Sequence, residues 1–534
     1  MDRATSSTPR TPLRSRSRVG WYLGLLILLA VYARSITMNV GEKNLVWDEA
    51  VIALNGLDLH TATPELFTDT YETVVDLVQA FPYYPPLLPI LLSFSYAVFG
   101  LSEFSVRIVS LVSGLLFPLL VFIFGREVGD EATGFLAALM LTASPIHYWM
   151  SRFGFVDMPM SILFTATMYL FYTGYERGEL SRIVLAGFTL GFAFLFKYPA
   201  VLCLPIILAY FILDVLISRR IGWRKAAAII LASEAALFIV LPWVYLTTTL
   251  SWKWQVWGHE ISPGKEYKWL MLENWTGNIV NMPEQMTLAI AIIGALGLVY
   301  SVWTREKIDR LILLWFAVVF LWFVPYHKDP RYTMPFIPAL ALAGSRLILA
   351  SLSGLSAALS KGTQDQGRVD GKRGTFTILG IVLVLVLVAP SFAGWLTFTP
   401  DRVPVREAVA YVARDIERER SVMVLMPDND LSHFAVYFYL RMGGLPYGSG
   451  VHVYTFGKTS EGELDSVELL TDCYRRRIQY LMLSDYAVWS ADWVRSLTED
   501  PGLRGFFSLE RVFRSEPGGR VVYILSYRGP LKQL

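Results

Sequence analysis

The chain has 534 residues, of which 54% are hydrophobic and 17% are charged, with a mean hydropathy of +0.44. This composition excludes a soluble globular protein and is typical of a polytopic membrane protein. The 47 basic residues nearly balance the 45 acidic ones. No basic stripe with interleaved aromatic residues occurs, so the sequence predicts no nucleic-acid partner.

Apolar runs long enough to cross a bilayer recur along the chain and predict about eleven membrane spans. They cover 20–39, 105–124, 132–150, 158–175, 181–196, 199–217, 226–247, 287–303, 311–326, 333–350 and 375–396. The tail 1–19 is basic and is expected in the cytoplasm. A cleavable signal peptide is the alternative for 1–35, but the apolar run is long for one and lacks a clear cleavage site.

The segment 84–100 is also apolar, but we predict a juxtamembrane helix rather than a twelfth span. It is short and opens with Pro85, Pro86 and Pro89. Omitting it as a span places the basic loops near 219–225, 305–310 and 361–373 in the cytoplasm, as the positive-inside rule favours. The first outer loop, 40–104, and a second one, 248–286, then lie outside.

The C-terminal region, 397–534, changes character. Apolar runs shorten to strand length at 421–426, 480–483 and 521–526, and amphipathic helical stretches lie at 404–418 and 466–478. We predict a soluble, extracytoplasmic α/β domain here, following a transmembrane catalytic domain over 20–396. Cys203 and Cys473 lack metal-ligand spacing, and neither a disulfide nor a zinc site is expected.

The predicted topology gathers ionisable residues at the outer face. Asp48 and Glu49 follow the first span, 151–157 and 197–199 form short outer turns, and 327–332 carries further charges. Carboxylates at this position can take a proton from a hydroxyl or hold a cation, and cations beside lipid can balance a lipid-linked phosphate. Taken singly, each group has a bland alternative: a solvated acidic loop, a structural ion pair between Arg152 and Asp157, or a snorkelling Lys197 or Arg331.

Aromatic residues are also concentrated in the second outer loop. They favour an interfacial belt over a sugar-binding platform. The tryptophans concerned are Trp252, Trp254, Trp257, Trp269 and Trp275.

At these residues the chain resembles the GT-C superfamily of membrane glycosyltransferases. The resemblance is to the glycosyltransferase family 39-like branch of protein O-mannosyltransferases and the lipid A aminoarabinose transferase. The motifs that carry it run in order over 20–350. They are Trp47-Asp48-Glu49-Ala50, Tyr84-Pro85-Pro86 with Ser102-Glu103-Phe104 and Arg107, Arg152-Phe153 with Asp157-Met158-Pro159, Phe194 to Pro199, and Pro330-Arg331-Tyr332.

The resemblance implies a fold, a reaction and roles for particular residues. It implies a GT-C architecture with a juxtamembrane helix, and inverting transfer of a sugar from a polyprenyl-phosphate carrier to an acceptor hydroxyl on the outer face. Asp48, with Glu49, would activate the acceptor, and Asp157 would support it. The residues expected at the carrier phosphate are Lys197, Arg331, Arg152, Tyr84 and Tyr332.

Two features of the site differ among family members. Some members carry Lys or His where this chain has Tyr84. Some use a divalent ion such as Mg or Mn, for which Asp48 and Asp157 would be the ligands here, and metal use stays open.

The leading hypothesis is therefore a hexosyl- or pentosyltransferase in the cell membrane that uses a dolichyl- or undecaprenyl-phosphate sugar. The acceptor is a protein, a glycolipid or a polysaccharide. A transporter or glycolipid flippase is the alternative, and it predicts mid-span charges, broken helices and an internal repeat. A receptor or scaffold is a third reading, which leaves the charged loops without a purpose.

Overall fold

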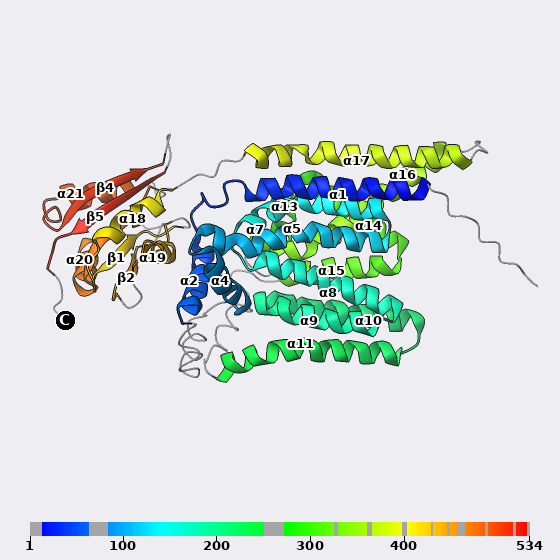
Figure 1. Cartoon of the computed structure of the whole chain (residues 1–534), viewed down its shortest axis with the longest axis horizontal. Coiled ribbons are helices and arrows are strands. Elements are labelled where there is room, and N and C mark those ends of the chain that lie inside the picture. The colour runs from blue at the N-terminus through cyan, green and yellow to red at the C-terminus, as the bar shows by residue number, and fades with distance from the viewer. Residues whose placement is uncertain are drawn as a thin grey trace, which may run out of the picture. The chain divides into compact units, whose positions relative to one another are not determined.

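The computed structural model describes residues 13–62, 84–249, 272–324, 329–359, 366–397, 403–428, 431–445, 449–457, 465–485, 490–515 and 520–530. Packing divides the chain into two compact units (Figure 1). The helical unit takes in the described residues of 1–38, 81–87 and 109–397. The sheet unit takes in those of 39–80, 88–108 and 398–534.

The helical unit consists of helices that lie side by side in Figure 1. They are α1 (Leu13–Thr37), α5 (Glu103–Val128), α6 (Glu131–Thr142), α7 (Pro145–Arg152), α8 (Asp157–Arg177), α9 (Leu180–Phe196), α10 (Cys203–Ser218), α11 (Trp223–Thr249), α13 (Leu272–Met286), α14 (Leu288–Thr304), α15 (Lys307–Phe323), α16 (Ile337–Leu359) and α17 (Gln366–Thr397). The 3-10 helices η2 (Tyr198–Leu202) and η3 (Pro330–Phe336) precede α10 and α16. The start of α5, from Glu103 to Ile108, belongs to the sheet unit.

Local sequence signals set several helix ends. Asp130 and Thr133 form a capping box at the start of α6, and Gly178 ends α8 in the left-handed conformation, with φ of 71°. Gly187 lets α9 approach α11 closely, because a Cβ at this position would collide with the carbonyl oxygen of Ala232.

Five of the described helices are long and apolar enough to cross a membrane, or six if the bent pair of α7 and α8 forms one span. The candidate spans are Val19–Thr37, Glu103–Val128, Tyr198–Ser218, Trp223–Thr248 and Pro330–Leu359. Shorter apolar helices of 10–17 residues account for several other predicted runs. A multi-pass membrane protein is thus supported, whereas the count of eleven spans is not confirmed.

One predicted span is wrong as a continuous helix. The run 132–150 divides into α6 and α7, because Pro145 lacks the N–H needed to continue α6 and instead begins the next helix. A second break at 153–156 bends the chain by 119° between α7 and α8. These two breaks bring Asp157 to the first turn of α8.

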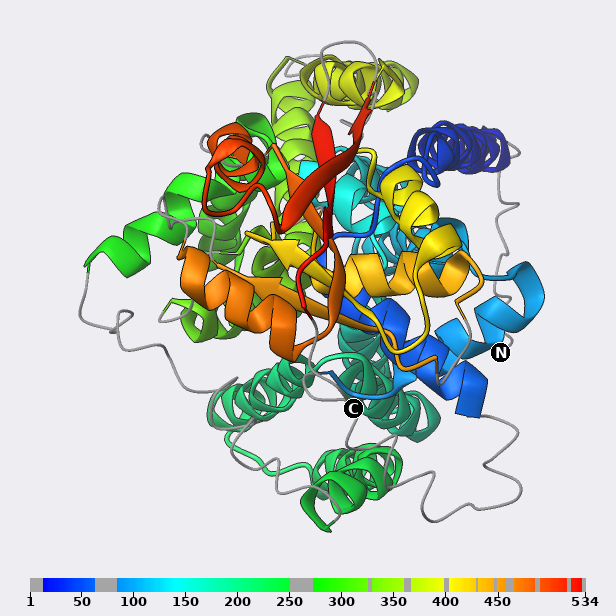
Figure 2. The same ribbon diagram turned by 90° about the vertical axis from the view of Figure 1, so that its left-hand side faces the viewer.

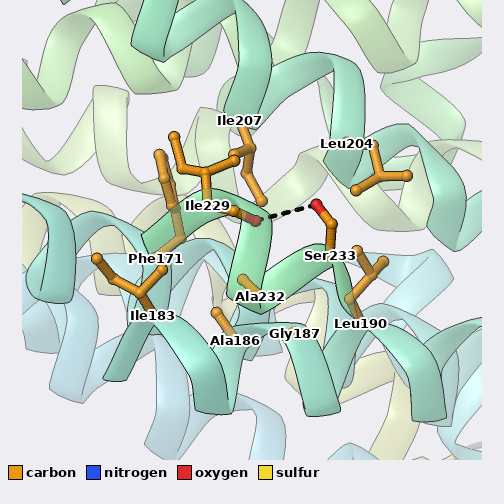
Figure 3. A pocket seen from close by; sticks show the side chains of 10 residues that line it. All are labelled: Phe171, Ile183, Ala186, Gly187, Leu190, Leu204, Ile207, Ile229, Ala232 and Ser233. Carbon is orange, nitrogen blue, oxygen red and sulfur yellow. Dashed lines mark hydrogen bonds between the residues drawn. The ribbon is translucent and has the colours of Figure 1, made fainter. Parts of the chain in front are cut away.

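An apolar pocket lies among α8, α9, α10 and α11 (Figure 3). Its only hydroxyl group, that of Ser233, donates a 3.0 Å hydrogen bond to the Ile229 carbonyl of its own helix, so the lining offers hydrocarbon contacts. The lining residues are Phe171, Ile183, Ala186, Gly187, Leu190, Leu204, Ile207, Ile229, Ala232 and Ser233.

The sheet unit combines two early helices with the C-terminal region. The early helices are α2 (Trp47–Ala62) and α4 (Leu87–Phe99). The C-terminal elements are α18 (Val405–Asp415), β1 (Ser421–Leu425), α19 (His433–Met442), β2 (His452–Phe456), α20 (Ser466–Arg475), β3 (Ile478–Ser484), α21 (Ser490–Glu499), β4 (Phe507–Arg514) and β5 (Val521–Tyr527). At 13 residues α4 is shorter than the roughly 20 needed to cross a bilayer, which supports the juxtamembrane prediction.

The strands form one mixed sheet in the order β2-β1-β3-β5-β4. β1 is parallel to β2 and β3, whereas β5 is antiparallel to β3 and β4. Figure 2 shows α18 and α19 on one face of the sheet and α20 and α21 on the other. Every residue of β1 is buried, as a central strand covered on both faces requires.

The three predicted strands and both predicted helices of this region are confirmed as β1, β3, β5, α18 and α20. The sequence prediction missed β2, β4, α19, α21 and α2.

Candidate active site

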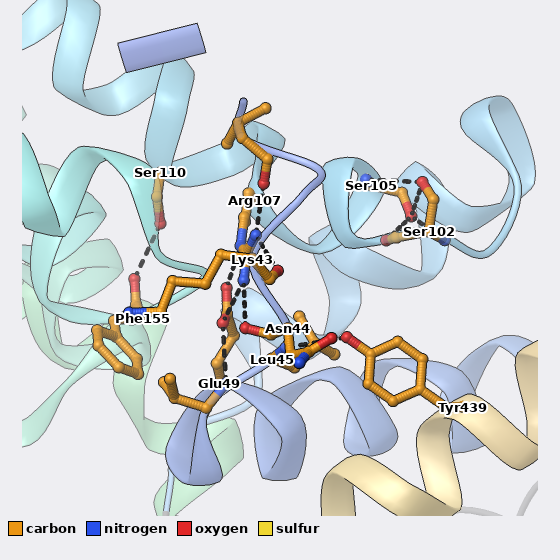
Figure 4. Close-up of polar contacts among 12 residues, drawn as sticks. Lys43, Asn44, Leu45, Glu49, Ser102, Ser105, Arg107, Ser110, Phe155 and Tyr439 are labelled. Carbon is orange, nitrogen blue, oxygen red and sulfur yellow. Dashed lines mark hydrogen bonds and ion pairs between the residues drawn. The ribbon is translucent and has the colours of Figure 1, made fainter. Parts of the chain in front are cut away.

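Glu49 and Arg107 form a two-pronged ion pair inside the sheet unit (Figure 4). Arg107 Nε lies 2.6 Å from Glu49 Oε1, and Arg107 Nη2 lies 2.8 Å from Glu49 Oε2. Both side chains are buried, with 1% and 0% of their surface exposed. Such a pair is stable only when the remaining donors and acceptors are satisfied as well.

Arg107 satisfies its other donors on the segment that leads into α2. It donates to the backbone carbonyls of Val40, Lys43 and Asn44 at 2.5, 2.8 and 3.0 Å. All five N–H groups of the guanidinium are therefore used, either on these carbonyls or on Glu49. One side chain of α5 thus fixes the path of residues 40–49.

Asp48 and Glu49 lie in the first turn of α2, so the prediction of an acidic loop is wrong in this respect. Oε2 of Glu49 accepts a 3.2 Å hydrogen bond from the Val46 N–H, which caps the start of the helix. These contacts give Glu49 a structural role, and they favour Asp48 over Glu49 for the catalytic role predicted for both. Asp48 is partly exposed, and its charge is favoured at this helix N-terminus.

Asp157 and Lys197 form a second buried ion pair, in the helical unit. Nζ of Lys197 lies 2.7 Å from Oδ1 of Asp157, and their side chains are 13% and 2% exposed. Asp157 begins α8 and Lys197 follows the last residue of α9, so the antiparallel packing of these helices brings the two together. Oδ2 of Asp157 is buried and accepts no hydrogen bond from the part of the chain that the structure describes.

Tyr332 and Arg331, both in η3, adjoin this pair. Lys197 Nζ lies 5.2 Å from the centre of the Tyr332 ring, and the Arg331 guanidinium lies 4.9 Å from the centre of the Phe155 ring. Phe155 is in the bend that precedes α8. The structure thus gathers Asp157, Lys197, Arg331 and Tyr332 as the sequence predicted.

Asp329 holds Arg331 in place. Its Oδ2 accepts hydrogen bonds from Nε and Nη2 of Arg331 at 2.9 and 2.6 Å, and its Oδ1 accepts one from the Arg331 backbone N–H at 3.0 Å. Burial alone would raise the pKa of Asp329, but the hydrogen bonds and charge of Arg331, together with the charge of Lys197, hold this pKa below its usual value.

The two remaining predicted site residues have different surroundings. Arg152 is buried at the end of α7, where it donates to the carbonyls of Ser35 and Ile36 at 2.9 and 3.2 Å. These carbonyls belong to the last turn of α1, so Arg152 caps that helix, and this contact favours a structural role over phosphate binding. Tyr84 is half-buried just before α4.

The metal site and the aromatic belt stay predictions. Among the residues that the structure describes, no group of three or more His, Cys, Asp or Glu side chains gathers as a metal site would require. His327 and Lys328, and the tryptophans at 252, 254, 257 and 269, lie outside the described residues. Trp275 is on α13.

Three residues that shape these sites have weak sequence signals or none. Arg107 is a lone arginine near the start of an apolar run, and this pattern indicates a buried partner. Asp329 stands two residues before Arg331, the spacing of a local carboxylate turn. Tyr439, whose hydroxyl contacts the Leu45 backbone, gave no signal, because the two are far apart in sequence.

Comparison with known proteins bears on the fold and family of this chain. The sequence model of a family described as dolichyl-phosphate-mannose-protein mannosyltransferase matches residues 84–246. An undecaprenyl phosphate-alpha-4-amino-4-deoxy-L-arabinose arabinosyl transferase 2 from Proteus mirabilis is 25% identical over 269 residues, which is 46% of each chain. An uncharacterized protein from Aquifex aeolicus is 24% identical over 268 residues, or 48% of this chain and 51% of that one. The matches thus span about half the length of these relatives.

Solved structures show the same fold over nearly the whole chain. ArnT from Cupriavidus metallidurans in the apo state superimposes with a TM-score of 0.62 at 15% identity, covering 95% of this chain and 98% of that one. The archaeal oligosaccharyltransferase AglB from Archaeoglobus fulgidus, in complex with an inhibitory peptide and a dolichol-phosphate, gives 0.60 at 13% identity, covering 95% and 74%. These findings confirm the resemblance to GT-C glycosyltransferases, and the chain has their fold.

Proposed function

We propose that this protein is an integral-membrane glycosyltransferase that moves a sugar from a polyprenyl-phosphate donor to an acceptor hydroxyl, with inversion at the anomeric carbon. The observation that carries the proposal is the gathering of Lys197, Asp157, Arg331 and Tyr332 at the ends of α8, α9 and in η3 of a GT-C fold. A solved ArnT with this fold binds undecaprenyl phosphate. The proposed site faces the extracytoplasmic side, and the N-terminus lies in the cytoplasm.

The cations of the helical unit suit a lipid-linked phosphate. The ammonium group of Lys197 has three N–H donors, and its hydrogen bond to Asp157 uses one of them. Asp329 holds the guanidinium of Arg331 from one side, so that little conformational freedom is lost on binding an anion. Negative charge grows on the phosphate oxygen as the sugar leaves, and fixed cations lower the energy of that state.

The proposed reaction assigns the proton to Asp48. The acceptor oxygen forms a bond to the anomeric carbon while the bond from that carbon to the phosphate oxygen breaks, and the electron pair of the broken bond goes to the phosphate. The acceptor proton passes to the carboxylate of Asp48, which remains partly exposed while Glu49 is engaged by Arg107. The products are a glycoside and the polyprenyl phosphate.

The proposal extends to both hexosyl and pentosyl donors, and to protein, glycolipid and polysaccharide acceptors. Where a divalent ion takes part, we propose Asp157 as a ligand in the helical unit, and the ion would stabilise charge on the phosphate. The buried Oδ2 of Asp157 is a suitable donor atom for a hard cation.

The test is release of polyprenyl phosphate by the purified protein in nanodiscs. It is offered a panel of polyprenyl-phosphate hexoses and pentoses with a membrane extract as acceptor, alongside Asp48→Asn. Release with one donor that disappears in Asp48→Asn supports the proposal and identifies the sugar. Movement of intact donor between leaflets without release, unaffected by Asp48→Asn, would contradict it and support a flippase.

A further inference from the structure

The C-terminal domain contacts the helix that carries Asp48. α19, which follows the central strand β1, packs on α2 within the sheet unit. The ring of Trp47 makes T-shaped contacts with the rings of His433 and Phe434, whose centres lie 5.2 and 5.7 Å from its own. Trp47 is the residue directly before Asp48, so this contact fixes one neighbour of the proposed proton acceptor.

Tyr439, on the same helix, binds the backbone that leads into α2. The Leu45 N–H donates a 3.0 Å hydrogen bond to the Tyr439 hydroxyl (Figure 4). Leu45 is 0% exposed and Tyr439 is 2% exposed, so water does not replace this bond if the hydroxyl is lost. The Asn44 side chain also donates to the Val403 carbonyl, just before α18. The C-terminal region therefore contacts three of the four residues from Asn44 to Trp47.

The opposite neighbour of Asp48 is fixed from α5. Glu49 is held by Arg107, which also binds the carbonyls of Lys43 and Asn44. Asp48 thus stands between two anchored residues, one held by the C-terminal domain and the other by α5. A proton acceptor must stay within hydrogen-bond reach of its substrate, and a displacement of about 1 Å can cost roughly 100-fold in rate.

We propose that Tyr439 and His433 of the C-terminal domain are positioning residues for Asp48. The C-terminal domain thereby acts in the reaction by holding the start of α2, whichever acceptor it also contacts. This inference rests on the function proposed above, because it assigns a purpose to the contacts around the proposed proton acceptor.

Tyr439→Phe tests the inference with Tyr437→Phe as its matched control. Both changes remove one hydroxyl from α19, but Tyr437 is only half-buried and makes none of the contacts to residues 44–47 described above. In Tyr439→Phe we expect amide hydrogen exchange in peptides covering 44–49 to quicken about tenfold and kcat to fall roughly 10- to 100-fold, with the donor KM unchanged. Tyr437→Phe is expected to match the wild type in all three.

His433→Ala is a second variant, which removes the ring that packs beside Trp47. We expect His433→Ala to lower kcat as Tyr439→Phe does. It therefore serves as the test if Tyr439→Phe does not fold. Wild-type kcat in either folded variant, with Asp48→Asn inactive, would overturn the positioning role and leave the proposed function intact. If the wild-type protein releases no polyprenyl phosphate from any donor, both the proposed function and the positioning role are overturned. If amide hydrogen exchange in 44–49 is as slow in Tyr439→Phe as in the wild type, Tyr439 does not anchor this segment.

Discussion

Arg107 and Glu49 pair through two parallel hydrogen bonds, at 2.6 and 2.8 Å, in a site where neither side chain reaches solvent. The pair joins α5 to the first turn of α2, and it separates the roles of two adjacent carboxylates. Glu49 organises the backbone, whereas Asp48, on the same turn, is partly exposed. Mutagenesis of each residue should therefore affect different properties of the protein.

Glu49→Gln should unfold the protein more readily, while Asp48→Asn should leave its stability near that of the wild type. The first change leaves the charge of Arg107 buried without its counter-ion, a loss of about 3–5 kcal/mol in comparable buried pairs. The measurement is the thermal unfolding midpoint of each variant in detergent. Equal midpoints for Glu49→Gln and the wild type would mean that Glu49 does not have the structural role assigned here.

Lys197→Ala should weaken binding of undecaprenyl phosphate by roughly 10- to 100-fold, because it removes the charge-assisted contact that we propose for the phosphate. Lys307→Ala is the control, since Lys307 is also ion-paired, with Glu176, but at the end of α8 opposite to Asp157. Binding is measured with the purified variants in nanodiscs, below their unfolding temperatures. Similar affinities for Lys197→Ala and Lys307→Ala would remove Lys197 from the phosphate site.

Gly187→Ala should destabilise the packing of α9 against α11 by about 1–3 kcal/mol, because the added methyl group collides with the Ala232 backbone. Gly354→Ala provides the comparison, as a Cβ there meets no atom within 4 Å and a helix generally gains from alanine. Detergent-solubilised yield and unfolding temperature report the difference. A Gly187→Ala variant as stable as the wild type would show that α9 and α11 can move apart to fit the methyl group without a loss of stability.

Asp58 should make the stability of the sheet unit depend on pH. Burial raises the pKa of this carboxyl to about 6, against the opposing charge of Arg441. Its unfolded pKa is about 3.9, so its contribution to stability is present below about pH 4 and is lost as the pH rises through 6. Asp58→Asn should therefore stabilise the protein at pH 7, by at most about 3 kcal/mol, and have little effect at pH 4. A difference in unfolding temperature that stays constant from pH 4 to 8 would contradict this assignment.

Orientation in the membrane is testable by cysteine labelling, because both native cysteines, Cys203 and Cys473, are buried. A cysteine replacing the exposed Glu42 should react with an impermeant maleimide in intact cells, whereas one replacing Ile221 should react only after permeabilisation. Ser102 is a poorer position for a label, since its hydroxyl accepts a hydrogen bond from the Ser105 N–H at the start of α5. The reverse labelling pattern would invert the proposed topology.

The sequence predicted the helical elements well because lipid-facing helices must be long and apolar, as α5, α10 and α11 are. It also predicted that Asp157, Lys197 and Arg331 would gather, since hydrophobic runs of known length place their ends at one face. The prediction from hydropathy was wrong where Pro145 divides one apolar run. Average hydropathy does not depend on the backbone N–H that proline lacks.

The contacts of Tyr439 and Arg107 could not be predicted for a different reason. Each depends on tertiary packing between segments that are distant in the chain, and a single sequence contains no local signal for such pairs. The same holds for α2, whose buried residues from Ala50 to Leu57 form a continuous run rather than the one-sided pattern of an amphipathic helix.

The sheet unit is discontinuous in sequence, and this has a consequence for biosynthesis. α2 leaves the ribosome early, but α19 follows only after α17 has been made. The segment from Asn44 to Glu49 therefore acquires its last hydrogen bonds when translation is nearly complete, although most of the helices have by then been synthesised. A nascent or truncated chain that lacks α19 is expected to lack the hydrogen bond from the Leu45 N–H to Tyr439, and with it part of the support for the start of α2.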